Sequence, residues 1–277
     1  SLLNFIYTPQ PPGPGLPLQA PSVYTFIDIN VYYKLMRIFH IPAYTDNYIW
    51  VMQSGSDISV IDPGDALPVL EHIKKNDLNL VDILLTHHHF DHVGGTLQLK
   101  KQISGKVYGP FGDIEGVDVH VAEKDKVETL DYEFSVLETP GHTLDHIAFV
   151  DKQKKLVFCG DTLFSAGCGR VFEGTFEQMH NSIQKLNRLD PETIIYCAHE
   201  YTESNLKFVT SVVDDEFIKE YAFELSQKIQ NGSISLPTKL KLERKINPFL
   251  LNTVPSDLKD LNPLEQFTEL RIRKYNF

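Results

Sequence analysis

The feature that most restricts the fold of this chain is a series of short apolar runs, each of which ends in a cluster of polar residues. Five runs show the pattern: ISVIDPGD (58–65), VDILLTHHHFDH (81–92), YEFSVLETPGHT (132–143), KLVFCGDT (155–162) and TIIYCAHE (193–200). Short runs rich in β-branched and aromatic residues, bounded by glycine, proline or polar residues, are typical of buried strands. Because functional loops often follow the strands of a rigid sheet, these polar clusters are candidate site residues.

Helical patterns become dominant toward the C-terminus. Three segments are predicted to be helical: 175–190, with Thr175 as N-cap, 202–232, as one long helix that ends at Asn231-Gly232, and 256–277, with Pro263 near a helix start. The fold class is therefore mixed α/β (α+β). We expect three parts: an N-terminal extension of uncertain origin (1–35), a domain that carries the polar clusters (36–200) and a helical domain (201–277).

Composition excludes several classes of protein. No apolar stretch approaches the roughly 18 residues of a membrane helix, so we expect no membrane partner. A formal net charge of -11 is unfavourable for binding nucleic acid, which normally requires a basic face. The 3 cysteines form no C-x-x-C pair, which favours a reducing, cytoplasmic location, with a mitochondrial or other organellar one as the alternative. The proline-rich segment 9–22 contains no arginine, unlike a transit peptide, and Met36 is a plausible original start.

The segment THHHFDH (86–92) concentrates side chains that bind metals. If the preceding strand continues through His89, then His87 and His89 point to the same side, while His88 points away. Asp91 and His92 follow where the strand gives way to a loop or a helix start. This one segment therefore offers four metal-ligand side chains, and His88 is predicted to face solvent or to support the others.

Three other strand ends complete the set with His142, Asp161 and His199. Five imidazoles and two carboxylates suit two zinc-type ions. A single histidine would more often be structural, and it is the joint occurrence that favours metal binding. His146 is predicted to be a hydrogen-bonded support. Asp62, which precedes Pro-Gly, either orients a ligand imidazole or only forms a turn.

The pattern T-H-x-H-x-D-H, followed by G-H-T, G-D-T and A-H-E at strand ends, resembles the metallo-β-lactamase superfamily, whose fold is an αββα sandwich. The resemblance implies a ligand set for two metals: His87, His89 and His142 for the first, Asp91, His92 and His199 for the second, and Asp161 as the bridge. It also implies catalytic roles for Asp91, Asp161, His87, His89 and His142.

Four further segments resemble the hydroxyacylglutathione hydrolase (glyoxalase II) family: GCGRVFEGT (167–175), CAHEYTESNLKF (197–208), INPFL (246–250) and LRIRKYNF (270–277). The resemblance covers the chain from about residue 36 onward. It implies that a helical second domain helps to bind glutathione through these residues: Arg170, Phe172, Tyr201, Arg271 and Lys274. Arginine and lysine suit the two carboxylates of glutathione.

The chain departs from the family pattern at three positions. Tyr275 occupies a place where aspartate is common, Phe172 one where some members have tyrosine, and Leu251 one where arginine is usual. These differences concern affinity for the thiol carrier, because every expected metal-ligand position is filled.

The reaction implied by the resemblance is hydrolysis of S-D-lactoylglutathione, and of related 2-hydroxyacyl glutathione thioesters, to D-lactate and glutathione. A hydroxide that bridges two divalent ions, most simply Zn²⁺ with iron or manganese as alternatives, would attack the thioester in this second step of methylglyoxal detoxification. The alternative is a persulfide dioxygenase or another thioesterase of the superfamily. A β-lactamase, a nuclease and a non-catalytic binding module are less favoured. We expect a monomer with a small-molecule substrate.

Overall fold

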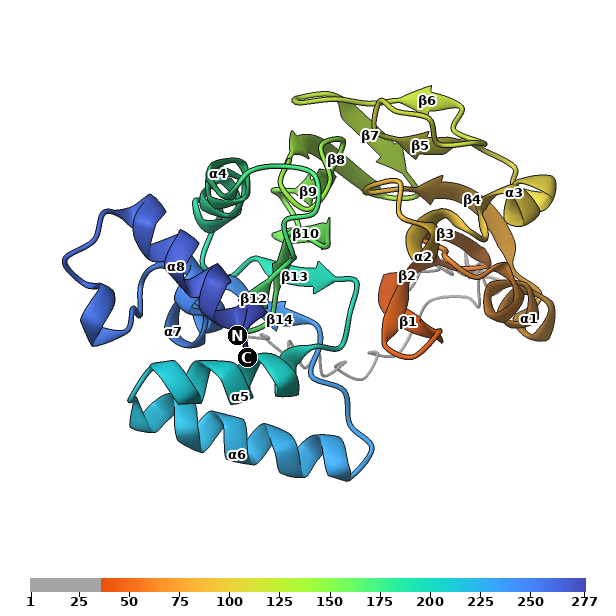
Figure 1. Ribbon diagram of the computed structural model, residues 1–277. Helices are drawn as coiled ribbons and strands as arrows, with labels where there is room; N and C mark the ends of the chain where they lie inside the picture. The colour runs from red at the N-terminus through yellow and green to blue at the C-terminus, as the bar shows by residue number, and fades with distance from the viewer. Residues whose placement is uncertain (1–35) are drawn as a thin grey trace, which may run out of the picture. The chain divides into compact units, whose positions relative to one another are not determined.

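The computed structural model describes residues 36–277, which build two β-sheets with helices around them (Figure 1). The predicted N-terminal extension, 1–35, lies outside the described residues. The first sheet has six strands in sequence order: β1 (Met36–Ala43), β2 (Asn47–Ser54), β3 (Asp57–Ile61), β4 (Asn79–Leu84), β5 (Val107–Gly109) and β6 (Val119–His120). The pairs β1–β2 and β2–β3 are antiparallel, and the strands from β3 to β6 pair in parallel.

The second sheet has the order β14-β13-β10-β9-β8-β7. Its strands are β7 (Lys126–Thr129), β8 (Tyr132–Glu138), β9 (Ile147–Asp151), β10 (Leu156–Gly160), β13 (Ile194–Cys197) and β14 (Thr238–Lys239). A small hairpin, β11 (Leu163–Phe164) with β12 (Gly167–Cys168), follows β10.

Both faces of the first sheet are buried, as its alternating side chains show. Tyr48, Trp50 and Met52 belong to a cluster that also contains Phe134 and Phe149 of the second sheet. The residues between them on β2 contribute to a separate cluster together with helix residues. Since successive strand residues point to opposite faces, one face packs on the other sheet and one on helices.

Helices cover the outer sides of the two sheets. On the side of the first sheet lie α1 (Ala66–Asn76), α2 (Phe90–Val93), α3 (Thr96–Leu99) and the 3₁₀ turn η1 (Lys100–Gln102). On the second sheet lies α4 (Phe176–Asn187), whose Met179 and Ile183 enter the core. Thr175 caps α4 in a capping box with Gln178, as predicted. This αββα arrangement confirms the expected fold class.

The C-terminal part is largely helical. It contains α5 (Thr202–Val212), α6 (Glu216–Gln230), α7 (Leu240–Ile246), η2 (Pro248–Leu250), η3 (Ser256–Leu258) and α8 (Pro263–Tyr275). The single helix expected over 202–232 is wrong. The first helix ends at Val212, and the Asp215 carboxylate accepts a hydrogen bond from the Ile218 backbone, which starts a second helix that lies beside the first (Figure 1). The stop at Asn231-Gly232 and the start at Pro263 are confirmed.

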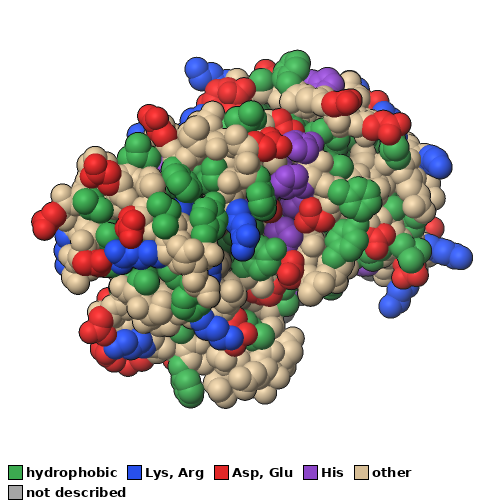
Figure 2. All heavy atoms as spheres, in the orientation of Figure 1, with side chains coloured by type: hydrophobic (Ala, Val, Ile, Leu, Met, Phe, Trp, Pro, Cys, Tyr) green, Lys and Arg blue, Asp and Glu red, His purple; other side chains and the backbone are tan. Residues whose placement is uncertain are grey.

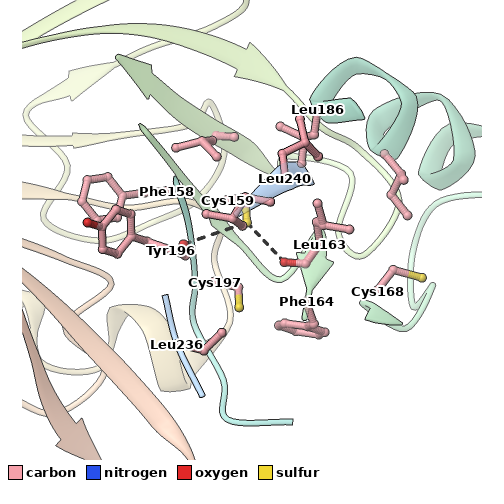
Figure 3. Packing of buried hydrophobic residues seen from close by; sticks show 14 of the residues in the cluster. Phe158, Cys159, Leu163, Phe164, Cys168, Leu186, Tyr196, Cys197, Leu236 and Leu240 are labelled. Carbon is pink, nitrogen blue, oxygen red and sulfur yellow. Dashed lines mark hydrogen bonds between the residues drawn. The ribbon is translucent and has the colours of Figure 1, made fainter. Parts of the chain in front are cut away.

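The C-terminal part also joins the second sheet. Strand β14 pairs with β13, and Leu236 and Leu240, which flank β14, pack with Phe158 of β10 in one continuous core cluster (Figure 3). Cys159 and Cys197 are buried in this cluster as free thiols. The boundary at residue 200 stays a prediction. No helix among residues 36–277 is long and apolar enough to cross a membrane.

Candidate active site

Every histidine and aspartate of the candidate site lies on a segment that follows or precedes a strand of the two sheets. His87 to His92 follow β4, His142 lies between β8 and β9, Asp161 follows β10 and His199 follows β13. The expectation that β4 continues through His89 is wrong, because the Thr86 backbone donates to the Asp62 carboxylate instead of to a neighbouring strand (2.7 Å). His87 and His89 nevertheless come together, with ring centroids 4.8 Å apart.

Two groups of donor atoms form where the sheets meet. His87, His89 and His142 have donor atoms within 4.8 Å of one another, and so do Asp91, His92 and His199. These are the two triplets expected from the sequence.

Asp161 lies between the two groups. Its Oδ2 is 3.4 Å from Nε2 of His142 and 3.3 Å from Nε2 of His199. Its Oδ1 is 3.5 Å from Nε2 of His92. In the second group, Oδ2 of Asp91 is 3.5 Å from Nε2 of both His92 and His199. Ligands about 2.1 Å from a tetrahedral ion lie roughly 3.4 Å from each other, so the spacing suits metal coordination.

Each of four imidazoles has a partner at Nδ1, so that Nε2 is the nitrogen left for a metal. Nδ1 of His142 lies 2.8 Å from the Arg170 carbonyl oxygen, which can only accept. Nδ1 of His199 lies 2.8 Å from the Asp46 carboxylate. The same relation holds for His92 with Asp62 (3.1 Å) and for His87 with the Thr86 hydroxyl (3.0 Å). With the proton on Nδ1, the Nε2 lone pair is available to a metal.

Buried atoms without partners complete the fit to a cation. Nε2 of His87, Nε2 of His92 and Oδ1 of Asp161 are buried and accept or donate no hydrogen bond among the described residues. Such groups are costly unless something satisfies them. The donor set therefore suits divalent metal ions, which bind nitrogen and carboxylate oxygen.

The charge states of His87 and Asp161 also favour metal binding. Burial lowers the pKa of His87 far below its usual value, and the neighbouring imidazole of His92 adds to this effect. Burial alone would raise the pKa of Asp161, but His199 and His92 hold it well below its usual range. Burial opposes protonation of His199, yet Asp161 and Asp46 raise its pKa to about 9. A neutral His87 and an ionised Asp161 are the forms that bind metals, whereas His199 is protonated at neutral pH and would release a proton to a bound cation.

Neighbouring residues support this arrangement. His146 is buried, with Nδ1 2.9 Å from the Thr139 hydroxyl and Nε2 accepting from the Asp161 backbone at 3.0 Å, so its supporting role is confirmed. Gly160 has φ 47°, and a Cβ there would overlap Thr86 and His146. The chain can therefore turn from β10 to Asp161 only with glycine at position 160.

His88 points away from both triplets, as expected. Its Nδ1 is 3.0 Å from Asp145, and its Nε2 is 3.1 Å from Glu173. Glu173 also accepts from the Leu144 backbone. His88 therefore connects three loops around the site.

Asp46 and Asn47 support the candidate site but were not predicted from the sequence. Asp46 lies in the turn between β1 and β2, where it holds His199, and Asn47, the first residue of β2, donates to the Asp91 carboxylate at 2.8 Å. The turn is anchored because the Tyr48 backbone donates to the Ala198 carbonyl. The general signal, a polar turn at a strand end, was present in AYTDNY (43–48), but the partners of Asp46 and Asn47 lie 153 and 44 residues away.

A cleft of about 490 Å³ opens over the metal-ligand candidates. All five predicted substrate-binding residues line it: Arg170, Phe172, Tyr201, Arg271 and Lys274. Phe164, Cys168, Ser204 and Asn205, which were not predicted, also line it. His87 and His92 do not and lie beneath it. The space-filling view shows a row of histidines with hydrophobic, acidic and basic side chains on either side (Figure 2).

Comparison with known proteins identifies the fold. A model of the metallo-β-lactamase superfamily matches residues 45–110 and 105–199. The crystal structure of BLEG-1 B3 metallo-β-lactamase has a TM-score of 0.58 at 21% identity, covering 78% of this chain and 99% of that one. The structure of TTHA1623 in a di-iron-bound form has a TM-score of 0.53 at 25% identity, covering 77% and 100%. Fold and site thus define a metallo-β-lactamase-type metalloprotein.

The C-terminal part and close relatives define the family. A model of the hydroxyacylglutathione hydrolase C-terminus matches residues 200–277. Hydroxyacylglutathione hydrolase of Aliivibrio fischeri (strain MJ11) is 45% identical over 254 residues, which is 88% of this chain and 100% of the relative. The hydroxyacylglutathione hydrolase of Pseudomonas savastanoi pv. phaseolicola is 48% identical over 223 residues, which is 78% of this chain and 86% of that relative. The chain belongs to the hydroxyacylglutathione hydrolase family.

Proposed function

We propose that this protein hydrolyses S-D-lactoylglutathione, and related 2-hydroxyacyl glutathione thioesters, to D-lactate and glutathione. Such a reaction is the second step of methylglyoxal detoxification. The observation that carries the proposal is one cleft with two different ends. Asp161 and members of both triplets line the part that we call the metal-ligand end, and Arg170, Arg271 and Lys274 line the part that we call the cationic end.

The site is proposed to hold two divalent ions, most simply zinc, with iron or manganese as alternatives. His87, His89 and His142 would hold one ion, Asp91, His92 and His199 would hold the other, and Asp161 would contact both. When bound, such ions supply a water of lowered pKa and polarise a carbonyl oxygen. The di-iron form of TTHA1623 supports a binuclear site on this fold.

The chain's own residues would position the reactants. Asp161 stays ionised because nearby imidazoles lower its pKa. Its carboxylate can therefore face both triplets and hold them at a fixed separation. The Asp91 carboxylate is 40% exposed and is held by Asn47. It can therefore accept a hydrogen bond from the attacking water. As the oxygen–carbon bond forms, the carbon–sulfur bond breaks and a thiolate leaves, which needs little acid assistance because thiols have a pKa of about 8.5.

The other end of the cleft would bind the glutathione part. Arg170, Arg271 and Lys274 offer positive charge to its two carboxylates. Tyr201 stacks on His199 with ring centroids 4.7 Å apart, and the 62% exposed ring of Phe172 lies beside His142. We accordingly assign catalysis to residues 36–200 and a share of substrate binding to residues 201–277.

The cellular setting is proposed on chemical grounds. Three buried cysteines without disulfides suit a reducing compartment, and we favour the cytoplasm, where glutathione is abundant. A monomer is proposed, because each element of the cleft comes from a single chain.

The proposal is tested by hydrolysis of S-D-lactoylglutathione with protein of measured metal content. We expect equal amounts of D-lactate and free thiol, loss of activity after chelation and recovery when zinc, iron or manganese is restored. Metal-loaded protein that releases no thiol would contradict the proposal. Oxygen uptake with glutathione persulfide would instead indicate a dioxygenase.

A further inference from the structure

Three positive side chains line one end of the cleft without a negative partner. Arg170, Arg271 and Lys274 form no ion pair with any carboxylate of residues 36–277. Arg271 is 3% exposed and donates to the Cys168 carbonyl, while its Nε is buried without a partner. Lys274 donates to the Ser204 carbonyl at 3.2 Å. Like charges this close repel one another, so other contacts must hold them.

Aromatic rings provide these contacts. The guanidinium of Arg271 lies 4.5 Å from the ring centroid of Tyr275 and 5.3 Å from that of Phe249. The ammonium of Lys274 lies 5.1 Å from the ring of Phe208 and 5.3 Å from that of Phe277. A ring face attracts a cation but carries no net charge. The rings therefore hold the cations while leaving their charge available to a ligand.

Tyr275 is the residue that joins the two arginines. Its ring lies 5.9 Å from the guanidinium of Arg170 as well as against Arg271. Its hydroxyl accepts a hydrogen bond from the Val171 backbone at 2.9 Å, which ties the end of α8 to the loop that carries Arg170. Tyr275 itself is not among the residues that line the cleft. Any effect of Tyr275 on substrate must therefore act through the arginines and the loop.

We propose that Tyr275 is a positioning residue that holds Arg170 and Arg271 toward the cleft with their charges uncompensated, so that the site selects a thiol carrier with carboxylates. The inference rests on the proposed thioester hydrolysis and concerns recognition of the carrier. A hydrocarbon side chain of similar size would fill the same space but offer no attraction to the cations. Their repulsion would then move the guanidinium groups apart.

The test compares Tyr275→Leu, which removes the ring, with Tyr275→Phe, which removes only the hydroxyl. The substrates are S-D-lactoylglutathione and a lactoyl thioester of a small uncharged thiol. For Tyr275→Leu we expect KM for the glutathione ester to rise about tenfold with kcat unchanged, in line with the strength of a cation–π contact. Rates with the uncharged ester should not change. Tyr275→Phe should retain most of the affinity.

A binding measurement separates this inference from the proposed reaction. Calorimetry with S-methylglutathione, which lacks a thioester, should show about tenfold weaker binding to Tyr275→Leu than to the native protein. Phe223→Leu is the matched control, because Phe223 is 68% exposed and makes no ring contact among the described residues. Failure of the native protein to hydrolyse the ester would remove the reaction but leave this binding result valid.

Three results would overturn the inference. One is an unchanged affinity of Tyr275→Leu for S-methylglutathione. Another is an equal loss of kcat with both esters, which would indicate general damage to the site. The third is an equal loss in Tyr275→Phe and Tyr275→Leu, which would assign the effect to the hydroxyl. Thermal unfolding of each variant identifies any loss that comes from misfolding.

Discussion

The two ends of the cleft hold their charged groups in different ways. At the metal-ligand end, imidazoles are tied by hydrogen bonds to oxygen acceptors, as His142 is to the Arg170 carbonyl and His199 to Asp46. At the cationic end, Arg271 and Lys274 rest on aromatic rings. Directional hydrogen bonds fix a donor atom to within a fraction of an ångström, as a metal site requires. Ring contacts are less directional and preserve net charge, which suits a ligand with flexible carboxylates.

The largest effect is expected at Asp161, which lies between the two triplets. Asp161→Ala should lower kcat/KM by at least about a thousandfold, because both proposed metal sites would lose a ligand. Metal content measured by elemental analysis should fall for both ions together. Asp214→Ala is a suitable control, since Asp214 is an exposed residue paired with Lys219. Retained activity with two bound metals would rule out the shared role.

A smaller effect is expected where a ligand only loses its hydrogen-bond partner. In Asp46→Ala, His199 keeps its ring but loses the carboxylate 2.8 Å from Nδ1. Metal affinity or activity should fall roughly 10- to 100-fold. Competition with a chelator measures the affinity. No change in either quantity would mean that the imidazole is oriented by other contacts, such as its stacking on Tyr201.

At the other end, removal of a cation should affect binding and leave the chemical step intact. Arg271→Met should raise KM for the glutathione ester roughly 10- to 100-fold with kcat nearly constant, because a charge-assisted contact is lost. Arg273→Met is the matched control on the same helix, since Arg273 pairs with Asp257 and Glu269 outside the cleft. A fall confined to kcat would show that Arg271 acts on the reaction itself.

The smallest effect is a dependence of KM on pH. Burial, followed by the charges of Arg271 and Arg170, lowers the pKa of Lys274 to about 8. The side chain is therefore charged below that pH and becomes neutral above it, so binding of an anionic carrier should weaken as pH rises through 8. We expect KM to increase a fewfold between pH 7 and 9, which corresponds to the loss of about one solvent-screened charge contact.

Lys274→Met provides the reference for this pH profile. The amino group of glutathione also titrates in the same range, and the variant retains that contribution alone. If KM depends on pH in the same way in the native protein and in Lys274→Met, Lys274 is excluded as the titrating group.

The two ends also differ in how far they could be predicted from the sequence. The metal-ligand candidates lie in short segments at strand ends, so composition and spacing point to His87, His89 and Asp91 directly. Asp46 was missed because its role depends on a contact with His199, which only the folded chain brings near.

Two structural predictions failed because a local hydrogen bond to an aspartate outweighed the pattern of apolar residues. The strand before the histidines goes no further because, after the Leu85 backbone has donated to Tyr108 of β5, Asp62 accepts from the backbone of Thr86. The helix expected over 202–232 breaks where Asp215 caps a new helix. At the cationic end, Arg271 and Lys274 followed from the family resemblance, but the part played by Tyr275 depends on a loop about 100 residues away. A side chain that acts on ligand through other residues has no recognisable motif.

The most direct test of the account compares two thioesters at one measured metal content. Native protein with two bound ions should hydrolyse S-D-lactoylglutathione with a kcat/KM at least about a hundredfold above that for the lactoyl ester of a small uncharged thiol, since several charge-assisted contacts are at stake. Equal kcat/KM values for the two esters would contradict the division of the cleft into a metal centre and a carrier-binding end.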